Sequence, residues 1–388
     1  MFYTSFQDLS LSQLGFGAMR LPLKEDKSVD EALTARMTDY AIAHGVNYFD
    51  TAWPYHGGES ERVMGRILKN YPRESFYLAT KYPGHQISET YDVRRVFEKQ
   101  LEKCGVEYFD FYLLHNVYER SIDVYRSKQW GIIDYLLEQK KNGRIRHLGF
   151  STHAGIPALT QFLDEYGNVM EFCQIELNYL DWTLQNAKEK CELLNARGLP
   201  IWVMEPVRGG KLAKLPGDLA EPLRAIEPDA SEASWALRWL MDIPGVTMVL
   251  SGMSDLSQMQ DNVRTFEAHR TLSASEREML LSIAEKLKNA LPCTACRYCC
   301  DGCPQGIDIP RMISVLNEIR FAPTVNAIMG IEALPEENKP SSCIGCGACA
   351  AVCPQNIDIP SAMEELSTRI RALPTWAEIS RQREAEQK

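Results

Sequence analysis

The chain has 388 residues, 45% of them hydrophobic and 24% charged, with a formal net charge of −10. This length suggests two or three compact units, and the composition argues against a disordered or fibrous protein. The negative charge excludes a nucleic-acid partner held by phosphate neutralisation. The first residues carry no signal-peptide pattern, and no uncharged apolar run reaches the ~18 residues that span a bilayer. We therefore expect a cytoplasmic protein with no membrane segment.

Eight short apolar runs, each followed by a segment of helical periodicity, account for the chain up to residue 253. They cover residues 14–19, 46–52, 76–82, 109–115, 145–151, 173–180, 201–207 and 247–253. Near-continuous apolar strands are typical of a parallel sheet buried on both faces. Eight strand–helix units of this length predict an α/β fold of the (β/α)8 TIM-barrel type. A doubly wound open sheet is the alternative, because periodicity alone does not distinguish the two. The first helix is expected to start after Ser28 and to stop at Gly45.

The last part of the chain contains a duplication. The segment "CTACRYCCDGCPQGIDIP" starts at Cys293, and "CIGCGACAAVCPQNIDIP" starts fifty residues later at Cys343. A helical stretch follows each "IDIP", and Ser273 with Glu276 forms a capping box before the duplication. The expected domains are a barrel over 1–272, a linker helix over 273–291, a small helical cysteine-rich domain over 292–370 and a charged tail over 371–388.

Each cysteine block has the form C-x2-C-x2-C-x3-C-P. Three closely spaced thiolates hold three corners of a [4Fe-4S] cluster, and the fourth cysteine, before the proline, ligates the other cluster. The spacing therefore predicts two clusters with crossed ligand sets: Cys293, Cys296, Cys299 and Cys353 for the first, and Cys343, Cys346, Cys349 and Cys303 for the second.

Zinc ribbons are the alternative reading of the cysteine blocks. They need only C-x2-C pairs, so they leave the third cysteine and the Cys-Pro ending unexplained. Cys300 is surplus to either set. Three isolated cysteines are expected to be small core residues rather than disulfide partners: Cys104, Cys173 and Cys191.

The blocks resemble those of dicluster bacterial ferredoxins. The fifty-residue offset and the helices after each block are more similar to helical ferredoxin domains attached to redox enzymes. The resemblance covers about residues 290–370 and implies iron-sulfur clusters, but it says little about the electron partner. A ferredoxin or a flavoprotein stays open as that partner.

Four ionisable residues follow the predicted barrel strands two to four. Asp50 ends the second strand, with Tyr55 just beyond it, while Lys81 and His115 end the third and fourth. A barrel builds its active site at these strand ends. A neighbouring ammonium lowers the pKa of a tyrosine from its usual value of ~10. We therefore expect Lys81 to activate Tyr55 and Asp50 to hold Lys81. His115 would orient a carbonyl or pass on the proton.

The segments "FDTAWPY", "ATK" and "LLH" resemble, in order and spacing, the Asp, Tyr, Lys and His tetrad of the aldo-keto reductases. The resemblance covers about residues 10–270. It implies that hydride passes from NAD(P)H to the carbonyl of a small-molecule substrate while Tyr55 protonates the oxygen. It also implies the contacts to the nucleotide: Ser151 and Gln174 at the nicotinamide, Arg208, Gly209, Gly210, Gly252 and Ser254 in the phosphate loops, and Asn262 at the adenine.

Three positions depart from the family pattern. Thr152 stands where many members have Asn, Met204 replaces the aromatic residue that stacks on the nicotinamide, and Ser254-Asp255 replaces a basic residue that reads the 2′-phosphate. A carboxylate repels a phosphate, so we expect NADH to bind at least as well as NADPH. FMN is an alternative occupant of the same pocket.

A hydride carries two electrons, whereas a cluster passes one. The leading hypothesis is an aldo-keto reductase-like oxidoreductase coupled to one-electron transfer through two clusters, with a flavin as the usual converter. One alternative is an NAD(P)H-dependent reductase with structural clusters. Another is an electron carrier or assembly subunit whose barrel is inactive, although a complete tetrad argues against it.

Overall fold

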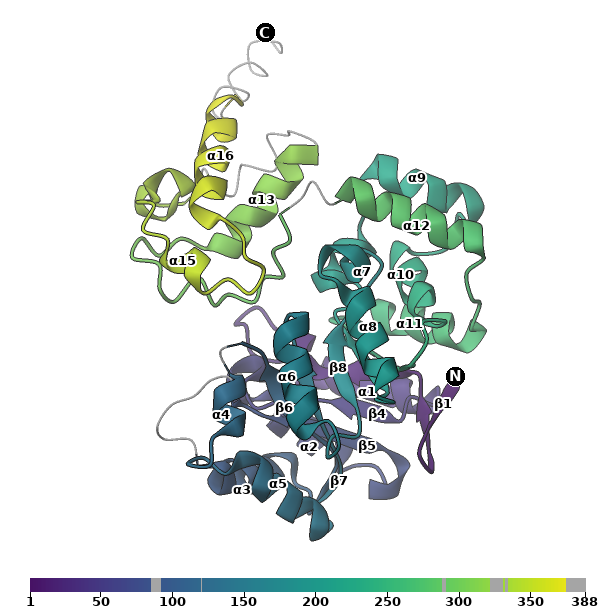
Figure 1. The fold of residues 1–388 in the computed structure, drawn as a ribbon. Helices are drawn as coiled ribbons and strands as arrows, with labels where there is room; N and C mark the ends of the chain where they lie inside the picture. Colours follow the sequence, from purple (N-terminus) through teal and green to yellow (C-terminus); the bar gives the residue numbers. More distant parts are fainter. Residues whose placement is uncertain (85–91, 120, 288–290, 322–330, 332–333, 375–388) are drawn as a thin grey trace. The chain divides into compact units, whose positions relative to one another are not determined.

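The computed structural model describes residues 1–84, 92–119, 121–287, 291–321, 331 and 334–374 (Figure 1). The chain divides into two compact units, Met1–Leu281 and Ser282–Lys388. Most of the expected charged tail lies outside the described residues, as do the last residues of the expected linker helix. Over the ranges given above, no helix is both long and apolar enough to cross a membrane.

Eight parallel strands of the first unit close into a barrel in the order β10-β3-β4-β5-β6-β7-β8-β9 (Figure 1). Each strand overlaps one of the eight predicted apolar runs. The (β/α)8 prediction is confirmed, and the doubly wound open sheet is wrong. The barrel strands are β3 Leu14–Gly17, β4 Tyr48–Asp50, β5 Tyr77–Tyr82, β6 Phe109–Val117, β7 Ile145–Thr152, β8 Cys173–Glu176, β9 Ile201–Met204 and β10 Val246–Ser251.

Helices connect the strands and cover the outside of the barrel (Figure 1). The α-helices of this unit are α1 Glu31–Ala43, α2 Ser60–Leu68, α3 Val93–Cys104, α4 Ile122–Arg126, α5 Ile132–Lys141, α6 Ile156–Tyr166, α7 Asp181–Leu184, α8 Ala187–Ala196, α9 Gly217–Ile226, α10 Glu232–Leu240, α11 Leu256–Ala268 and α12 Ala274–Leu287, the last of which continues into the second unit. Short 3-10 turns are η1 Ala18–Arg20, η2 Tyr55–Gly58, η3 Arg73–Ser75 and η5 Arg208–Ala213.

The ends of two helices test the capping predictions. The prediction that Ser28 starts α1 is wrong: Asp30 is the N-cap, and its side chain accepts a 3.0 Å hydrogen bond from Leu33 N. Ser28 instead donates to Asp26. The capping box before α12 is confirmed, because Ser273 N donates to Glu276 at 2.8 Å and Glu276 N donates to Ser273 Oγ at 3.3 Å.

An antiparallel hairpin precedes the barrel, formed by β1 Tyr3–Phe6 and β2 Leu9–Ser12. We did not predict it, since four-residue strands carry little pattern. Phe6 packs with ring-centroid distances of 5.0 Å to Trp202 and 5.6 Å to Phe111, both buried residues near the start of their strands. The hairpin therefore closes the N-terminal end of the barrel, and the C-terminal strand ends are left to form a site.

The second unit is mainly helical (Figure 1). Its elements are α13 Ile309–Phe321, η6 Glu336–Asn338, η7 Pro340–Ser342, α15 Ala348–Ala351 and α16 Ile359–Arg371. The two longer helices, α13 and α16, each begin at the last isoleucine of an "IDIP" segment, with the proline in the first turn, where its missing N–H costs nothing. Equivalent apolar side chains from both halves of the duplication form one core: Ile307, Ile309, Ile313 and Leu316 from the first half, and Ile357, Ile359, Met363 and Leu366 from the second.

Candidate active site and cluster sites

The predicted tetrad comes together at the C-terminal ends of β4, β5 and β6. Lys81 Nζ donates to Asp50 Oδ1 at 2.5 Å, to Thr51 O at 2.9 Å and to Tyr55 Oη at 3.3 Å. The rings of Tyr55 and His115 meet edge to face, with centroids 5.9 Å apart. One phenol, one ammonium, one carboxylate and one imidazole thus share a single site.

Burial controls the electrostatics of this site. The Lys81 side chain is fully buried, and although burial lowers its pKa, the Asp50 carboxylate and Tyr55 outweigh that effect and raise the pKa above its usual value. Burial also raises the pKa of Tyr55, and Lys81 opposes this only in part. The expected net lowering of the Tyr55 pKa is therefore wrong. Tyr55 stays a protonated phenol, which is the form that a proton donor needs.

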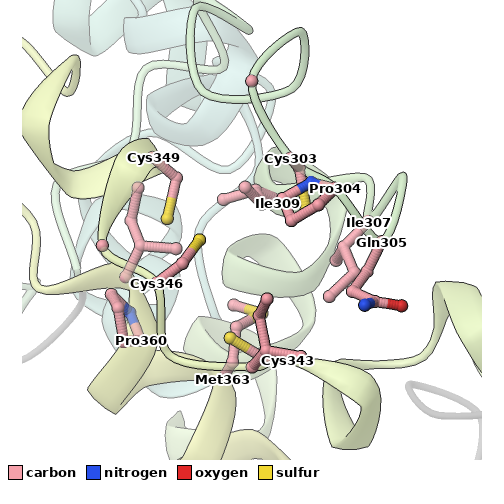
Figure 2. A pocket seen from close by; sticks show the side chains of 14 residues that line it. Cys303, Pro304, Gln305, Ile307, Ile309, Cys343, Cys346, Cys349, Pro360 and Met363 are labelled. Carbon is pink, nitrogen blue, oxygen red and sulfur yellow. The ribbon is translucent and has the colours of Figure 1, made fainter.

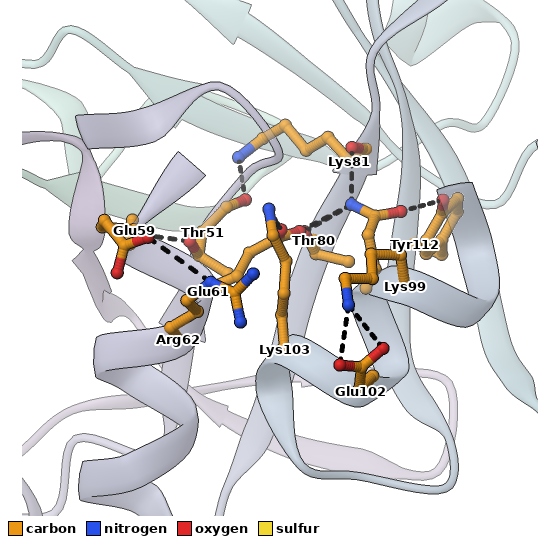
Figure 3. Close-up of polar contacts among 12 residues, drawn as sticks. Thr51, Glu59, Glu61, Arg62, Thr80, Lys81, Lys99, Glu102, Lys103 and Tyr112 are labelled. Atoms are coloured by element: carbon orange, nitrogen blue, oxygen red, sulfur yellow. Dashed lines mark hydrogen bonds and ion pairs between the residues drawn. The ribbon is translucent and has the colours of Figure 1, made fainter. Parts of the chain in front are cut away.

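A buried carboxylate that the sequence analysis missed, Glu61, lies beside the strand that carries Lys81 (Figure 3). Glu61 Oε1 accepts hydrogen bonds from Thr80 Oγ1 at 2.7 Å and from Gln100 Nε2 at 2.6 Å, and Oε2 accepts one from Lys103 Nζ at 2.9 Å. Gln100 Nε2 also lies 3.0 Å from Lys81 O. This network ties α2 and α3 to the strand that carries Lys81. Its sequence signal was a glutamate on the apolar face of a helix.

Two predicted nicotinamide contacts lie side by side, because Ser151 and Gln174 are paired in register between β7 and β8. Asn116 N donates to Ser151 Oγ at 2.8 Å, and Gln174 Nε2 lies 3.5 Å from Met204 Sδ. Gln174 Oε1 is buried and accepts no hydrogen bond from the described residues. A buried amide oxygen without a donor fits a ligand that carries an N–H group, as a carboxamide does.

The predicted phosphate loops follow β9 and β10. Gly209 and Gly210 have φ values of 64° and 92°, a conformation that favours glycine. A Cβ built on Gly209 would lie 3.3 Å from an Arg20 guanidinium nitrogen, and one built on Gly252 would lie 3.2 Å from Arg20 Cβ. Arg20 therefore lies between the two loops, where it also pairs with Glu205 at 3.5 Å.

Arg20 is a second residue that the sequence analysis missed. It stands three residues beyond the end of β3, and the Ser254 hydroxyl donates to its carbonyl oxygen at 2.9 Å. Its position three residues beyond a strand end was the sequence feature that could have indicated a place at the active site. The predicted residue Ser254 is exposed and close to this arginine backbone.

Three other residues singled out at the cofactor site already have partners within the chain. Arg208 is buried, and its Nε donates to Asp181 at 2.8 Å, while Asn262 Nδ2 donates to Ser251 Oγ at 2.9 Å. Asp255 is the N-cap of α11, where its carboxylate accepts from Gln258 N at 2.9 Å. Burial raises the pKa of Asp255, but hydrogen bonds from Ser257 and Gln258 outweigh it and lower the pKa. Contact between these residues and a nucleotide stays a prediction.

In the second unit, the eight predicted cysteines surround two cavities in the crossed arrangement expected. Figure 2 shows one cavity, whose lining includes Cys303, Cys343, Cys346 and Cys349. The lining of the other includes Cys293, Cys296, Cys299 and Cys353. The surplus Cys300 is not among the described residues that line either cavity.

The donor set and the surroundings of these cavities fit clusters. Apolar side chains such as Ile309 and Met363 complete the lining of one cavity, and Ile313 and Ile357 that of the other. Four thiolates around one cavity can take the four corners of a [4Fe-4S] cluster. Cys104, Cys173 and Cys191 are buried, as predicted for core residues.

Comparison with known proteins identifies both units. The model of the aldo/keto reductase family matches residues 13–285, and that of the 4Fe-4S dicluster domain matches residues 292–357. The chain is 28% identical over 316 residues to L-galactose dehydrogenase of Arabidopsis thaliana, covering 72% of this chain and 93% of that one. It is 23% identical over 332 residues to the NADH-specific methylglyoxal reductase of Escherichia coli, covering 72% and 97%.

Among solved structures, the holo form of aldo-keto reductase AKR11C1 from Bacillus halodurans aligns with a TM-score of 0.59 and 26% identity, covering 73% of this chain and 96% of that one. The family match extends over most of the barrel unit. The chain therefore belongs to the aldo/keto reductase family and is an oxidoreductase that carries a 4Fe-4S dicluster domain after its barrel.

Proposed function

We propose that the barrel reduces the carbonyl group of a small molecule, with Tyr55 as the general acid. The observation that carries this proposal is the position of Lys81 Nζ, which is within hydrogen-bond distance of Asp50 at 2.5 Å and of Tyr55 at 3.3 Å. The buried ammonium orients the phenol and stabilises the charge that develops when the phenol gives up its proton. His115, edge to face with Tyr55, orients the substrate oxygen. A bound nicotinamide supplies the hydride.

The described residues support a nicotinamide at Ser151 and Gln174, where the Gln174 amide oxygen is buried without a donor. The backbone of Gly209, Gly210 and Gly252 would approach the phosphates. The similarity to a protein named NADH-specific methylglyoxal reductase agrees with the NADH preference that we propose for this chain. FMN in this pocket is the alternative. Mass analysis of the cofactor released from anaerobically purified protein distinguishes the two.

The nucleotide preference gives a testable prediction. NADH should bind at least as tightly as NADPH, because Ser254 and Asp255 provide no cation for a 2′-phosphate. Ser254→Arg should strengthen NADPH binding by roughly 1–2 kcal/mol, about the contribution of a charge-assisted hydrogen bond. Asp255→Asn is the matched variant, since asparagine keeps the N-cap of α11 while removing the charge. Arginine at position 255 would remove the cap as well.

Titration of both nucleotides against the wild type and the two variants measures this preference. Tight NADPH binding together with weak NADH binding by the wild type would contradict the prediction. If neither nucleotide binds, the FMN alternative is favoured.

We further propose that the second unit binds two [4Fe-4S] clusters and that these clusters pass single electrons between the barrel and a ferredoxin or flavoprotein. The first cluster would be held by Cys293, Cys296, Cys299 and Cys353, and the second by Cys343, Cys346, Cys349 and Cys303. The grouping of the cysteines around the two cavities supports this ligand assignment.

A cytoplasmic location agrees with twelve cysteines that form no disulfide.

Two clusters predict about eight irons and eight acid-labile sulfides per chain. Elemental analysis of anaerobically purified protein tests this number, and zinc or four irons would contradict it. Cys300→Ser is the matched control and should leave the iron content unchanged, whereas Cys303→Ser should lower it. Bleaching of the cluster absorbance by NADH when a flavin is present to divide the hydride into single electrons would support electron transfer over a structural role.

A further inference from the structure

The duplication in the second unit gives nearly every position around one cavity a counterpart around the other. Between residues 293–311 and 343–361, the charged side chains differ at three pairs of positions: Arg297 and Gly347, Asp301 and Ala351, Arg311 and Ser361. The two halves therefore hold the same cysteines in different electrostatic surroundings.

Arg297 is the charged residue that reaches a cavity. It lines the cavity of Cys293, Cys296, Cys299 and Cys353, and its guanidinium lies 3.1 Å from Asp308 Oδ1. The equivalent Gly347 lines the other cavity without a side chain. The aspartate itself is common to both halves, since Asp358 takes the position equivalent to Asp308. Asp358 accepts hydrogen bonds from Ser361 N at 3.2 Å and from Ser361 Oγ at 2.7 Å. Among the described residues that line the two cavities, the charged side chains differ by one cation, Arg297.

The backbone at these positions shows that the arginine is not the locally preferred residue. Arg297 has a φ of 68° and Gly347 a φ of 74°, so the two positions share the left-handed conformation that glycine adopts most easily. A Cβ built on Gly347 would meet no atom within 4 Å. An arginine held in a glycine conformation beside a cysteine-lined cavity points to a role of its side chain there.

We infer that Arg297 makes the cluster of the Cys293 cavity the easier of the two to reduce, so that an electron entering the unit comes to rest there. The inference rests on the proposed function, in which both cavities hold clusters. Reduction adds one negative charge to a cluster and its thiolates, and a nearby guanidinium stabilises that charge.

A second charge difference lies close to a cavity in the sequence. Asp301 lies two residues before Cys303, which lines the other cavity, while the equivalent position before Cys353 is Ala351. A negative charge next to a ligand of the Cys343 cavity would act in the same direction as Arg297.

The electron balance is simple. If a one-electron donor reduced the unit, exchange between the clusters would oxidise one by one electron as it reduced the other by one, and the electron would rest on the cluster that Cys293, Cys296, Cys299 and Cys353 would hold. The thiolates would keep their bonds to iron, and no proton is required.

A potentiometric titration of the full-length protein with dithionite under anaerobic conditions, followed by electron paramagnetic resonance, tests the inference. The wild type should show two one-electron waves. Arg297→Gly should move the higher-potential wave to lower potential, and Arg297→Lys, which keeps the charge, should move it much less. Gly347→Arg should raise the lower-potential wave. Because the Arg297 side chain is 59% exposed, added salt should narrow the separation of the wild-type waves.

Iron analysis separates the possible failures. A wild type with fewer than eight irons overturns both the two-cluster proposal and this inference. If the wild type has eight irons but Arg297→Gly leaves both waves unmoved, or shifts only the lower-potential wave, this inference alone is overturned. If Arg297→Gly loses iron, its potentials cannot be compared with those of the wild type. The Gly347→Arg variant, which retains Arg297, is then the test. If its lower-potential wave does not rise, the inference is overturned.

Discussion

Replacing Tyr55 by phenylalanine should lower the rate of carbonyl reduction by about 10²–10⁴-fold, the usual contribution of a positioned general acid. The substitution removes one hydroxyl, which accepts a 3.3 Å hydrogen bond from Lys81. The phenyl ring keeps its edge-to-face contact with His115, so the shape of the site is preserved. Steady-state kinetics with NADH should show a fall in kcat, while titration should show nearly unchanged nucleotide binding and iron content.

Tyr3→Phe is the matched control. It also removes one phenolic hydroxyl, but from the hairpin at the other end of the barrel, where Tyr3 Oη donates to Gly45 O at 2.9 Å. This variant should retain full activity. Turnover by Tyr55→Phe at the wild-type rate would exclude Tyr55 as the proton donor and leave the tetrad without its proposed function.

Replacing Asp50 by asparagine should destabilise the barrel by about 3–5 kcal/mol, the typical cost of removing one partner of a buried ion pair. Asp50 and Lys81 are both almost fully buried, and their charged atoms lie 2.5 Å apart. Without the carboxylate, the Lys81 ammonium is buried with no compensating charge, so its pKa falls toward neutrality. Urea unfolding, followed by the fluorescence of buried Trp202 and Trp235, measures the loss.

A double substitution separates stability from catalysis. Asp50→Asn combined with Lys81→Met removes both charges, so it should recover most of the lost stability and none of the activity. Glu102→Gln breaks the exposed pair with Lys99 and should change the unfolding midpoint little. Equal stability of Asp50→Asn and the wild type would mean that the pair is not ionised in the folded protein.

Features carried by local spacing were predictable from the sequence. The C-x2-C-x2-C-x3-C-P blocks restrict where their thiolates can go, and the duplication places the fourth cysteine of each block beside the other cavity, as the structure has it. The tetrad was predictable for the same reason, because Asp50, Lys81 and His115 each end or nearly end an apolar strand. Consecutive parallel strands bring such ends together.

The tertiary structure decided which partner each polar side chain found. Arg208 looked available for a phosphate in the sequence, yet it is buried against Asp181, and the suspected phosphate-repelling Asp255 caps α11. Arg20 and Glu61 gain their places from strands and helices that lie far from them in the chain. Contacts of this kind depend on how helices pack around the barrel, which the local pattern of residues does not specify.

The pKa of Tyr55 shows the same division within one residue. The order and spacing of Asp50, Tyr55 and Lys81 could be seen in the sequence, and they predicted that an ammonium would lie beside the phenol. The net direction of the pKa shift depends on how much water the fold removes from the ring. Burial is a property of the packed barrel, and here it outweighs the ammonium, so only the tertiary structure decided that the pKa of Tyr55 rises.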